Sequence, residues 1–295
     1  EQKLLVKEKS KSLMRLDMGK LVTLPTGENV PSMGLGTWHM GERIGNPKTE
    51  VDALIRGLDL GATLIDTAEM YARGGAERVV GSAIKGRRDD VFIVSKILPH
   101  NASFDGTIRA CENSLQRMEI ESIDLYLLHW PGNHPLESTI SAFEQLKTDG
   151  KIKHWGVSNF DTSDMQELYG IPEGENCQIN QVLYNLSRRG IEWDLLPWCR
   201  SMGLPIMAYS PIEQGRLLEN KKLKALASEI GVSAAQLSIA WSIRKNDIIT
   251  IPKASNLEHV SQNIDAWTIK LESTVLDELD KLFEPPVRKK GLDIL

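Results

Sequence analysis

The sequence predicts an α/β fold in which eight parallel strands close into a (β/α)8 barrel, with an N-terminal β-hairpin and additional helices. Short apolar runs, typical of buried parallel strands, alternate with amphipathic helical patterns along the chain. The runs end at intervals of 23 to 33 residues, and a last interval of 44 residues leaves room for an extra helix. The strand ends lie near Trp38, Asp66, Lys96, His129, Ser158, Gln181, Tyr209 and Lys253.

Local patterns predict the other elements. Residues 22–31 are typical of a hairpin with a glycine-containing turn. A helix is expected to begin at Asn46-Pro47 and to end at Gly61, since proline favours the first helical position and glycine the end. Further helices are expected around residues 108–118, 136–143, 223–230 and 273–283, with capping boxes at 233–236 and 255–258.

Length and composition favour one domain. The chain has 295 residues, 41% hydrophobic and 25% charged, and no change in composition divides it. Single α/β barrels of about 250 residues are common, so we expect one TIM barrel domain over residues 19–295. Residues 1–18 carry five basic residues without the apolar segment of a signal peptide. We interpret them as an N-terminal extension, either a remnant of an expression tag or a functional arm.

Several function classes are disfavoured by the composition. The net charge of −5 gives no basic surface for nucleic acid, and the longest apolar runs are far too short to span a membrane. Cys111, Cys177 and Cys199 are far apart and form no CxxC pair, which fits a reducing compartment. We expect a monomeric cytoplasmic protein without a nucleic-acid or membrane partner.

Four polar residues follow three consecutive predicted strands. Asp66 and Tyr71 follow the second strand, Lys96 the third and His129 the fourth. Each alone has an ordinary structural explanation, such as a helix cap or a core histidine. A buried strand has no packing reason to end on an ionisable side chain, and (β/α)8 barrels build active sites at these strand ends. We therefore predict that the four side chains form one catalytic site.

These residue types suit the reduction of a carbonyl group. Because no side chain supplies a hydride, a cofactor is implied. A free tyrosine has a pKa of about 10, too high for efficient acid catalysis at neutral pH, and a nearby ammonium lowers it. We expect Lys96 to lower the pKa of Tyr71, the general acid, and Asp66 to keep Lys96 charged. A neutral His129 would bind the substrate oxygen or relay a proton.

Around these residues the chain resembles the aldo-keto reductase family, and most of all its bacterial aldehyde and methylglyoxal reductases. The resemblance covers about residues 20–283. It implies an NADPH-dependent barrel reductase with Tyr71 as the acid, Lys96 and Asp66 as its tuning pair, and His129 orienting the carbonyl. The matching segments, in order, are 34–38, 66–71, 95–96, 127–131, 156–160, 180–185, 208–211 and 251–253.

The same resemblance implies a cofactor site on the other strand ends. Ser158, Asn159 and Gln181 would bind the nicotinamide carboxamide, and Tyr209 would stack on the ring. The pyrophosphate would lie along Ser210, Pro211, Ile212, Gly215 and Arg216. The adenosine 2′-phosphate would meet Lys253 and the helix start after it, with Ala254, His259, Gln262 and Asn263 at the remaining family positions.

The chain departs from the family pattern at the phosphate end of this site. Ala254, His259 and Gln262 stand where serine, arginine and glutamate are usual. An arginine carries a permanent planar charge, whereas a histidine titrates near neutral pH. We therefore expect NADPH as the cofactor, with weaker discrimination against NADH than is usual, so that NADH is also accepted.

Trp38, Met70 and Trp130 are predicted to wall the substrate pocket. The loop between His129 and the next helix and the tail after residue 283 are short. A shallow, tolerant pocket is therefore expected, suited to small aldehydes and α-dicarbonyl compounds such as methylglyoxal.

Four alternatives remain open. The chain could reduce sugars or keto acids, or it could be a cofactor-binding regulatory subunit like the potassium-channel β-subunits. A metal-dependent hydrolase would use Asp66, His129 and His154 as ligands, but a strand-end His-x-His pair is absent and we expect no metal.

An open doubly wound sheet is disfavoured as an alternative fold, since residues 34–39 contain only the first two glycines of the dinucleotide-binding fingerprint.

Overall fold

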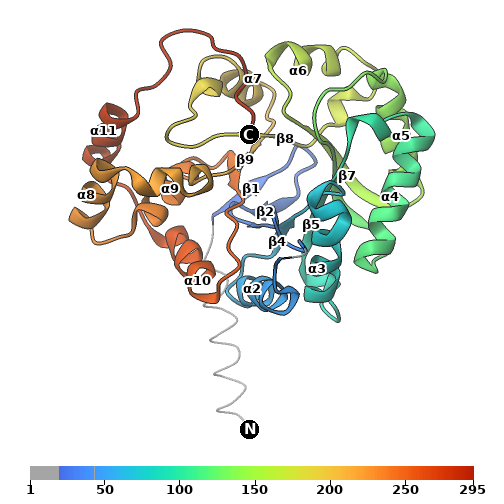
Figure 1. The fold of residues 1–295 in the computed structure, drawn as a ribbon. Helices are drawn as coiled ribbons and strands as arrows, with labels where there is room; N and C mark the ends of the chain where they lie inside the picture. The colour runs from blue at the N-terminus through green and yellow to red at the C-terminus, as the bar shows by residue number, and fades with distance from the viewer. Residues whose placement is uncertain (1–19, 43) are drawn as a thin grey trace, which may run out of the picture.

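Eight parallel strands form the centre of the molecule, and an antiparallel hairpin precedes them (Figure 1). The computed structural model describes residues 20–42 and 44–295, so the extension predicted at residues 1–18 lies outside the described residues. The hairpin consists of β1 (Leu21–Thr23) and β2 (Asn29–Pro31). The barrel strands are β3 (Leu35–Gly36), β4 (Leu64–Asp66), β5 (Phe92–Ile97), β6 (Ile123–Leu128), β7 (Ile152–Ser158), β8 (Asn180–Leu183), β9 (Ile206–Tyr209) and β10 (Ile248–Thr250).

The sheet closes on itself. Each strand from β3 to β10 pairs in parallel with the next along the chain. At the closing edge, the Thr250 amide donates to the Ser32 carbonyl at 2.8 Å, and the Gly34 amide donates to the Thr250 carbonyl at 2.8 Å. The predicted (β/α)8 barrel with an N-terminal hairpin is therefore confirmed.

Helices surround the barrel on its outside (Figure 1). α8 occupies the long interval between the last two strands, as the sequence predicted. The helices are α2 (Pro47–Asp59), α3 (Gly75–Ala83), α4 (Phe104–Met118), α5 (Leu136–Thr148), α6 (Thr162–Tyr169), α7 (Leu195–Ser201), α8 (Lys221–Glu229), α9 (Ala234–Ser242), α10 (Leu257–Asp265) and α11 (Ser273–Leu282).

Short polar side chains fix where the helices begin. Asn46 caps α2, and Ser233 forms the expected capping box with Gln236 at α9. The second predicted capping box is wrong, because α10 is capped by Asn256 and not by Ser255. The Asn256 side-chain oxygen accepts from two backbone amides, and the Ser255 hydroxyl accepts from Lys253 instead.

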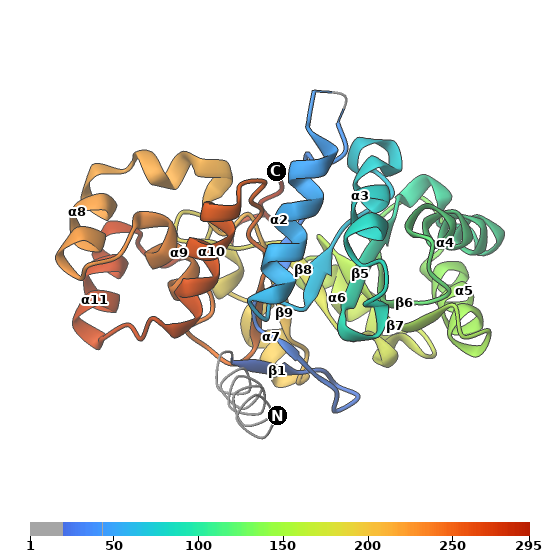
Figure 2. The ribbon, with the colours of Figure 1, turned by 90° about the horizontal axis from the view of Figure 1, so that it is seen from below.

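The two ends of the barrel differ. Val22, Leu24 and Val30 of the hairpin region pack against the apolar residues inside the barrel and close one end. Figure 2 shows the hairpin at that end and the C-terminus of the chain at the other. The carboxyl ends of the strands, which carry the predicted catalytic residues, therefore face the end that the hairpin leaves open. Within residues 20–42 and 44–295, no helix is long and apolar enough to cross a membrane.

Candidate active site

Lys96 lies at the centre of the site. Its Nζ donates to Asp66 Oδ2 at 2.8 Å, to the Thr67 carbonyl at 2.8 Å and to the Tyr71 hydroxyl at 3.2 Å. β4 and β5 are neighbours in the sheet, so the end of one brings Asp66 beside Lys96 on the other. His129 follows β6, and its ring lies 5.9 Å from the Tyr71 ring between centroids. The structure thus brings all four candidate catalytic residues together.

Burial governs the acid–base properties of Tyr71 and Lys96. Burial raises the pKa of the Tyr71 hydroxyl well above its usual value, and the nearby Asp66 and Tyr209 add to this. Burial also lowers the pKa of Lys96, although Asp66 opposes the change. This direction is opposite to the expected lowering of the tyrosine pKa, because burial disfavours the charged phenolate. Tyr71 stays protonated, with the Lys96 ammonium placed to stabilise negative charge as it develops on the phenol.

His129 is neutral in this environment. Burial first, and the Lys96 charge second, lower the pKa of its imidazole to about 2. Its Nδ1 atom is buried and has no hydrogen-bond partner among the described residues. Its backbone carbonyl accepts from Asn159 Nδ2 at 3.1 Å, which ties it to the next strand end. A neutral histidine here agrees with the sequence-based expectation.

A cavity of about 670 Å³ opens over the catalytic cluster. This volume is in the range of small-molecule and cofactor sites. The predicted wall residues Trp38, Met70 and Trp130 line it together with Asp66, Tyr71 and His129. Of the predicted cofactor residues, those that also line it are Ser158, Asn159, Gln181, Tyr209, Ser210, Pro211, Ile212, Gly215 and Lys253.

The inner part of the predicted cofactor site is a connected hydrogen-bond network. The Tyr209 hydroxyl donates to Asn159 Oδ1 at 3.0 Å, and the Ser158 hydroxyl donates to the Gln181 carbonyl at 2.9 Å. Gln181 Nε2 donates to Asp66 Oδ1 at 2.7 Å, which joins this network to the catalytic cluster. Ser158 and Asn159 do not cap the following helix, since Asp161 does so. Their side chains are free of that structural role.

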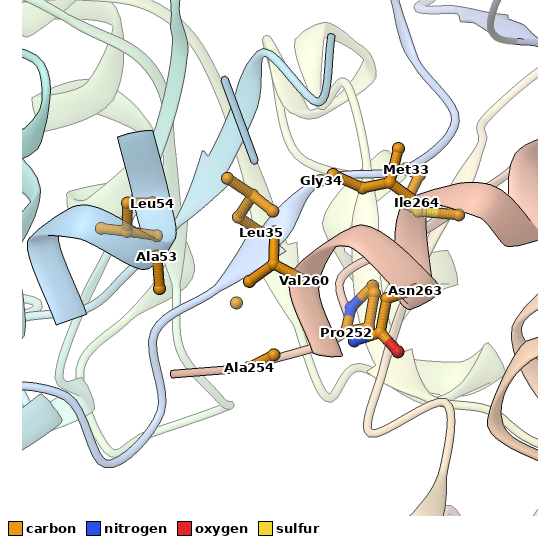
Figure 3. Close-up of a pocket in the computed structure, with 11 residues that line it drawn as sticks. Met33, Gly34, Leu35, Ala53, Leu54, Pro252, Ala254, Val260, Asn263 and Ile264 are labelled. Atoms are coloured by element: carbon orange, nitrogen blue, oxygen red, sulfur yellow. The ribbon is translucent and has the colours of Figure 1, made fainter. Parts of the chain in front are cut away.

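Five predicted cofactor residues do not line the cavity. Arg216 donates to Glu213 at 3.1 Å, and its side chain is otherwise exposed. His259 and Gln262 lie on the exposed face of α10. Ala254 and Asn263 line a separate small pocket among apolar side chains of β3, α2 and α10 (Figure 3). Only Lys253 of the predicted phosphate-binding group shares the main cavity.

Left-handed backbone conformations gather around the cavity. Non-glycine residues with positive φ include His39 at 65°, Asn159 at 58°, Ser210 at 51° and Gln214 at 54°, and all four line the cavity. Such conformations are unfavourable for residues with a side chain and are typical of functional sites. The sequence reasoning missed His39 and Gln214, because neither has a motif of its own.

The end of the chain was also missed. Ile294 and Leu295 line the cavity, whereas the predicted site included no part of the short tail after residue 283. The one signal in the sequence is this apolar pair, which follows the charged stretch 288–290.

The third residue of the hypothetical metal site lies elsewhere. His154 is at the start of β7, and its Nε2 is 2.6 Å from Glu28 Oε2 near the hairpin end of the barrel. Among the described residues, no group of three or more His, Cys, Asp or Glu side chains is arranged to hold a metal ion.

Comparisons with known proteins agree with this geometry. The chain is 49% identical to the methylglyoxal reductase YeaE of Escherichia coli, an alignment that covers 94% of this chain and 99% of that protein. It is 34% identical to the glyoxal reductase of Bacillus subtilis, over 88% of this chain and 92% of that one. The crystal structure of an aldo-keto reductase from Klebsiella pneumoniae in complex with NADPH superimposes with a TM-score of 0.92 at 50% identity, covering 94% and 99% of the two chains.

A family-level comparison gives the same assignment. Residues 32–284, which include the four candidate catalytic residues and every barrel strand, match the aldo/keto reductase family. This chain belongs to the aldo/keto reductase family.

Proposed function

We propose that this protein reduces the carbonyl group of small aldehydes and α-dicarbonyl compounds, methylglyoxal among them, with NADPH. The observation that carries the proposal is the contact of Lys96 with both Asp66 and Tyr71 at the base of the cavity. The names of two relatives, a methylglyoxal reductase and a glyoxal reductase, support the substrate class. Klebsiella pneumoniae structures in complex with NADPH, and with NADP and acetate, support the cofactor.

The residues of the cavity fit a nicotinamide nucleotide. Gln181 lines the cavity, and its side-chain oxygen accepts no hydrogen bond from the described residues, so it is available to a carboxamide. The Tyr209 ring lines the same cavity, held through its hydroxyl by Asn159. Lys253 offers a cation for a phosphate. When bound, NADPH supplies the hydride that no side chain can provide.

The side chains of the cluster have separate roles. Tyr71 gives its phenolic proton to the substrate oxygen, and its hydroxyl is free to do so because it accepts, rather than donates, the hydrogen bond from Lys96. The Lys96 ammonium stabilises the phenolate that forms, and Asp66 holds that ammonium in place. The neutral His129 orients the carbonyl group beside Tyr71.

Replacing the proton donor tests the proposal. We expect Tyr71→Phe to lower kcat for methylglyoxal by about 10²- to 10⁴-fold, the usual contribution of general acid catalysis. NADPH oxidation followed by absorbance gives the rate, and fluorescence titration should show unchanged NADPH affinity. Tyr126→Phe is the matched control, because the Tyr126 hydroxyl is buried without a partner among the described residues. Normal turnover by Tyr71→Phe would remove the proposed acid.

A substrate panel separates the alternatives for this site. Methylglyoxal, an aromatic aldehyde, a keto acid and an aldose sugar would be compared by kcat/KM with NADPH. We expect the first two to be preferred, because the cavity walls beside Tyr71 include the apolar faces of Trp38 and Trp130. Negligible turnover of all four would favour the regulatory-subunit alternative.

A further inference from the structure

The C-terminal segment, residues 284–295, crosses the open end of the barrel. It leaves α11 on the outside of the barrel and ends near the barrel centre (Figure 1). Ile294 and Leu295 line the same cavity as Trp38 and Tyr71. The segment contains no helix or strand, so its position depends on contacts with other parts of the chain.

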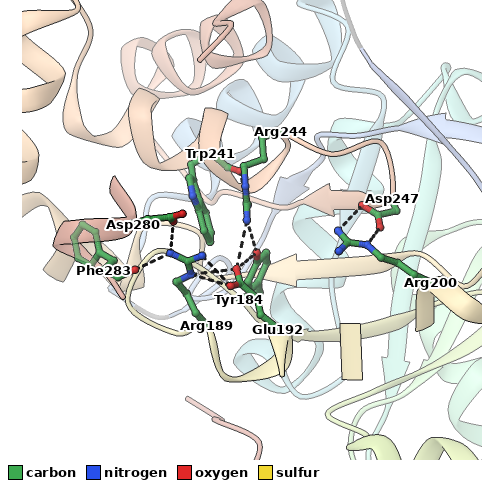
Figure 4. Close-up of polar contacts among 9 residues, drawn as sticks. All are labelled: Tyr184, Arg189, Glu192, Arg200, Trp241, Arg244, Asp247, Asp280 and Phe283. Carbon is green, nitrogen blue, oxygen red and sulfur yellow. Dashed lines mark hydrogen bonds and ion pairs between the residues drawn. The ribbon is translucent and has the colours of Figure 1, made fainter. Parts of the chain in front are cut away.

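Its beginning is fixed by a buried arginine. Arg189, only 7% exposed, donates to the Phe283 carbonyl at 2.6 Å and to Asp280 at 2.6 Å (Figure 4). The same guanidinium is paired with Glu192 and lies over the Trp241 ring. This contact sets the point at which the C-terminal segment leaves α11.

Two further ion pairs hold the segment along its course. Asp194 pairs with Lys289 at 2.9 Å, and Arg188 pairs with Asp293 at 3.4 Å. Both partners outside the segment belong to residues 188–194, between β8 and α7, as does Arg189. One short loop therefore contacts the segment near its start, its middle and its end.

Arg188 has a second carboxylate partner on a different wall of the cavity. Its Nε atom donates to Glu213 Oε1 at 2.9 Å, and its Nη2 atom forms an ion pair with the same oxygen at 2.8 Å, while Nη1 contacts Asp293. Glu213 is buried and sits between Ile212 and Gln214, which both line the cavity. One planar guanidinium thus touches residues 210–215, which follow β9, and the C-terminal segment.

We propose that Arg188 is a positioning residue that couples cofactor binding at residues 210–215 to the placement of Ile294 and Leu295 against the substrate. This inference rests on the proposed function. Arg188 does not line the cavity, so it acts through its two carboxylate partners. A cofactor bound to residues 210–215 would hold Glu213 in place. Glu213 would then position Arg188, and Arg188 would position Asp293. As a result, Ile294 and Leu295 would lie against the carbonyl compound.

The Arg188–Asp293 ion pair is not expected to contribute much to the stability of the fold. The Arg188 and Asp293 side chains are 36% and 38% exposed, and exposed ion pairs contribute little to folding. Loss of the pair should therefore leave the melting temperature almost unchanged, while substrate binding suffers. That difference distinguishes a positioning role from a structural one.

Kinetics of single and double variants test the coupling. We expect Asp293→Asn to raise KM for methylglyoxal at least about fivefold, the lower end of typical coupling between sites, with kcat little changed. Arg188→Ala should raise both this KM and the Kd of NADPH, and Arg188→Lys should be intermediate. The double variant Arg188→Ala, Asp293→Asn should have the KM of Arg188→Ala, because both changes break one contact.

A matched control is an ion pair at the other end of the barrel. Asp247 directly precedes β10 and pairs with Arg200 of α7 (Figure 4), at the strand starts, so Asp247→Asn should change neither KM nor Kd. Wild-type KM and Kd in both Asp293→Asn and Arg188→Ala would overturn the proposal. So would a KM increase that appears equally in Asp247→Asn.

A second measurement does not depend on turnover. Amide hydrogen exchange in residues 290–295 should slow when NADPH is added to the wild-type protein, and it should not respond in Arg188→Ala. An identical response in both proteins would overturn the coupling even if the enzyme is active. If carbonyl turnover is absent but the exchange difference is present, the proposed function fails and the coupling stands.

Discussion

Lys96 is fully buried, yet its ammonium has an anionic, a carbonyl and a phenolic partner. A buried ion pair does not add to stability reliably, because desolvation offsets the attraction. The positive charge of Lys96 is instead chemically useful, since the ammonium faces the Tyr71 hydroxyl, the proposed proton donor. Asp66 therefore has two tasks, to balance the charge of Lys96 and to hold Gln181 at the cofactor side.

This arrangement leads to a prediction for stability and activity together. Lys96→Met leaves the Asp66 carboxylate buried without a cation, so we expect a loss of about 3–5 kcal/mol in the free energy of unfolding. The double variant Asp66→Asn, Lys96→Met should recover most of that loss and still lack reductase activity. Urea unfolding and NADPH oxidation give the two quantities. A double variant as unstable as Lys96→Met would show that the pair is not the cause.

The pKa directions predict a simple pH profile for carbonyl reduction. His129, with a pKa of about 2, is already neutral throughout the working range and gives no acidic limb. Tyr71, with a raised pKa, stays protonated, whereas the lowered pKa of Lys96 means that its ammonium is lost first as pH rises. We expect kcat/KM to be flat through neutral pH and to fall on the alkaline side. A step near the ordinary histidine pKa of about 6.5 would contradict a neutral His129.

The sequence predicted that Asp66, Tyr71, Lys96 and His129 lie together, but not the acid–base state of Tyr71. The residue types at three strand ends are visible in the sequence, and strand ends in a parallel barrel meet at one face. The burial of Tyr71 depends on tertiary contacts, such as that with the Trp38 ring 4.9 Å away between centroids, which residue types alone do not reveal. Burial then decided the direction of the pKa shift.

At the scale of single elements, α10 carries His259 and Gln262, two of the predicted cofactor residues that depart from the family pattern. Its cap, Asn256, binds two backbone amides at the helix start, and His259 lies exposed in the first turn. Local sequence predicted a helix here but placed the cap one residue early. Serine and asparagine are both good caps, so the choice between Ser255 and Asn256 was set by the path of the chain after Lys253.

The exposed position of His259 allows a direct test of cofactor choice. We expect His259→Arg to tighten NADPH binding on the order of tenfold, since one hydrogen bond to a charged group contributes about 1.5 kcal/mol. The affinity for NADH, which lacks the 2′-phosphate, should stay the same and serves as the internal control. Fluorescence titration with both nucleotides gives the ratio. Equal gains for both would place the new guanidinium elsewhere than at the phosphate.

At the scale of the whole molecule, the number of strands and their closure were predictable because the βα pitch repeats along the chain. The return of the C-terminal segment was not, because it depends on ion pairs between loop residues and partners about a hundred positions away, such as Arg188 with Asp293. No local pattern encodes those pairs. The monomeric state and the cytoplasmic location stay predictions.

The hairpin end of the barrel has its own electrostatic contact. Glu28 of the hairpin turn accepts hydrogen bonds from Lys153 and His154 at the start of β7, both at 2.6 Å. Burial opposes ionisation of Glu28, but these two partners outweigh it and lower its pKa below its usual value. A carboxylate whose folded pKa is lowered stabilises the protein above its unfolded pKa. That contribution disappears as pH falls through the folded value.

We therefore expect Glu28→Gln to lower the free energy of unfolding at pH 7 by about 1 kcal/mol. The difference from wild type should shrink as the pH falls below about 4.3, the pKa of a glutamate in the unfolded chain. Turnover at neutral pH should not change, because the hairpin and the cavity lie at opposite ends of the barrel. Glu278→Gln, which removes an exposed pair with Lys281, is the control and should have no effect at either pH. A difference of the same size at neutral and acidic pH would mean that the carboxylate charge is not what holds the hairpin against β7.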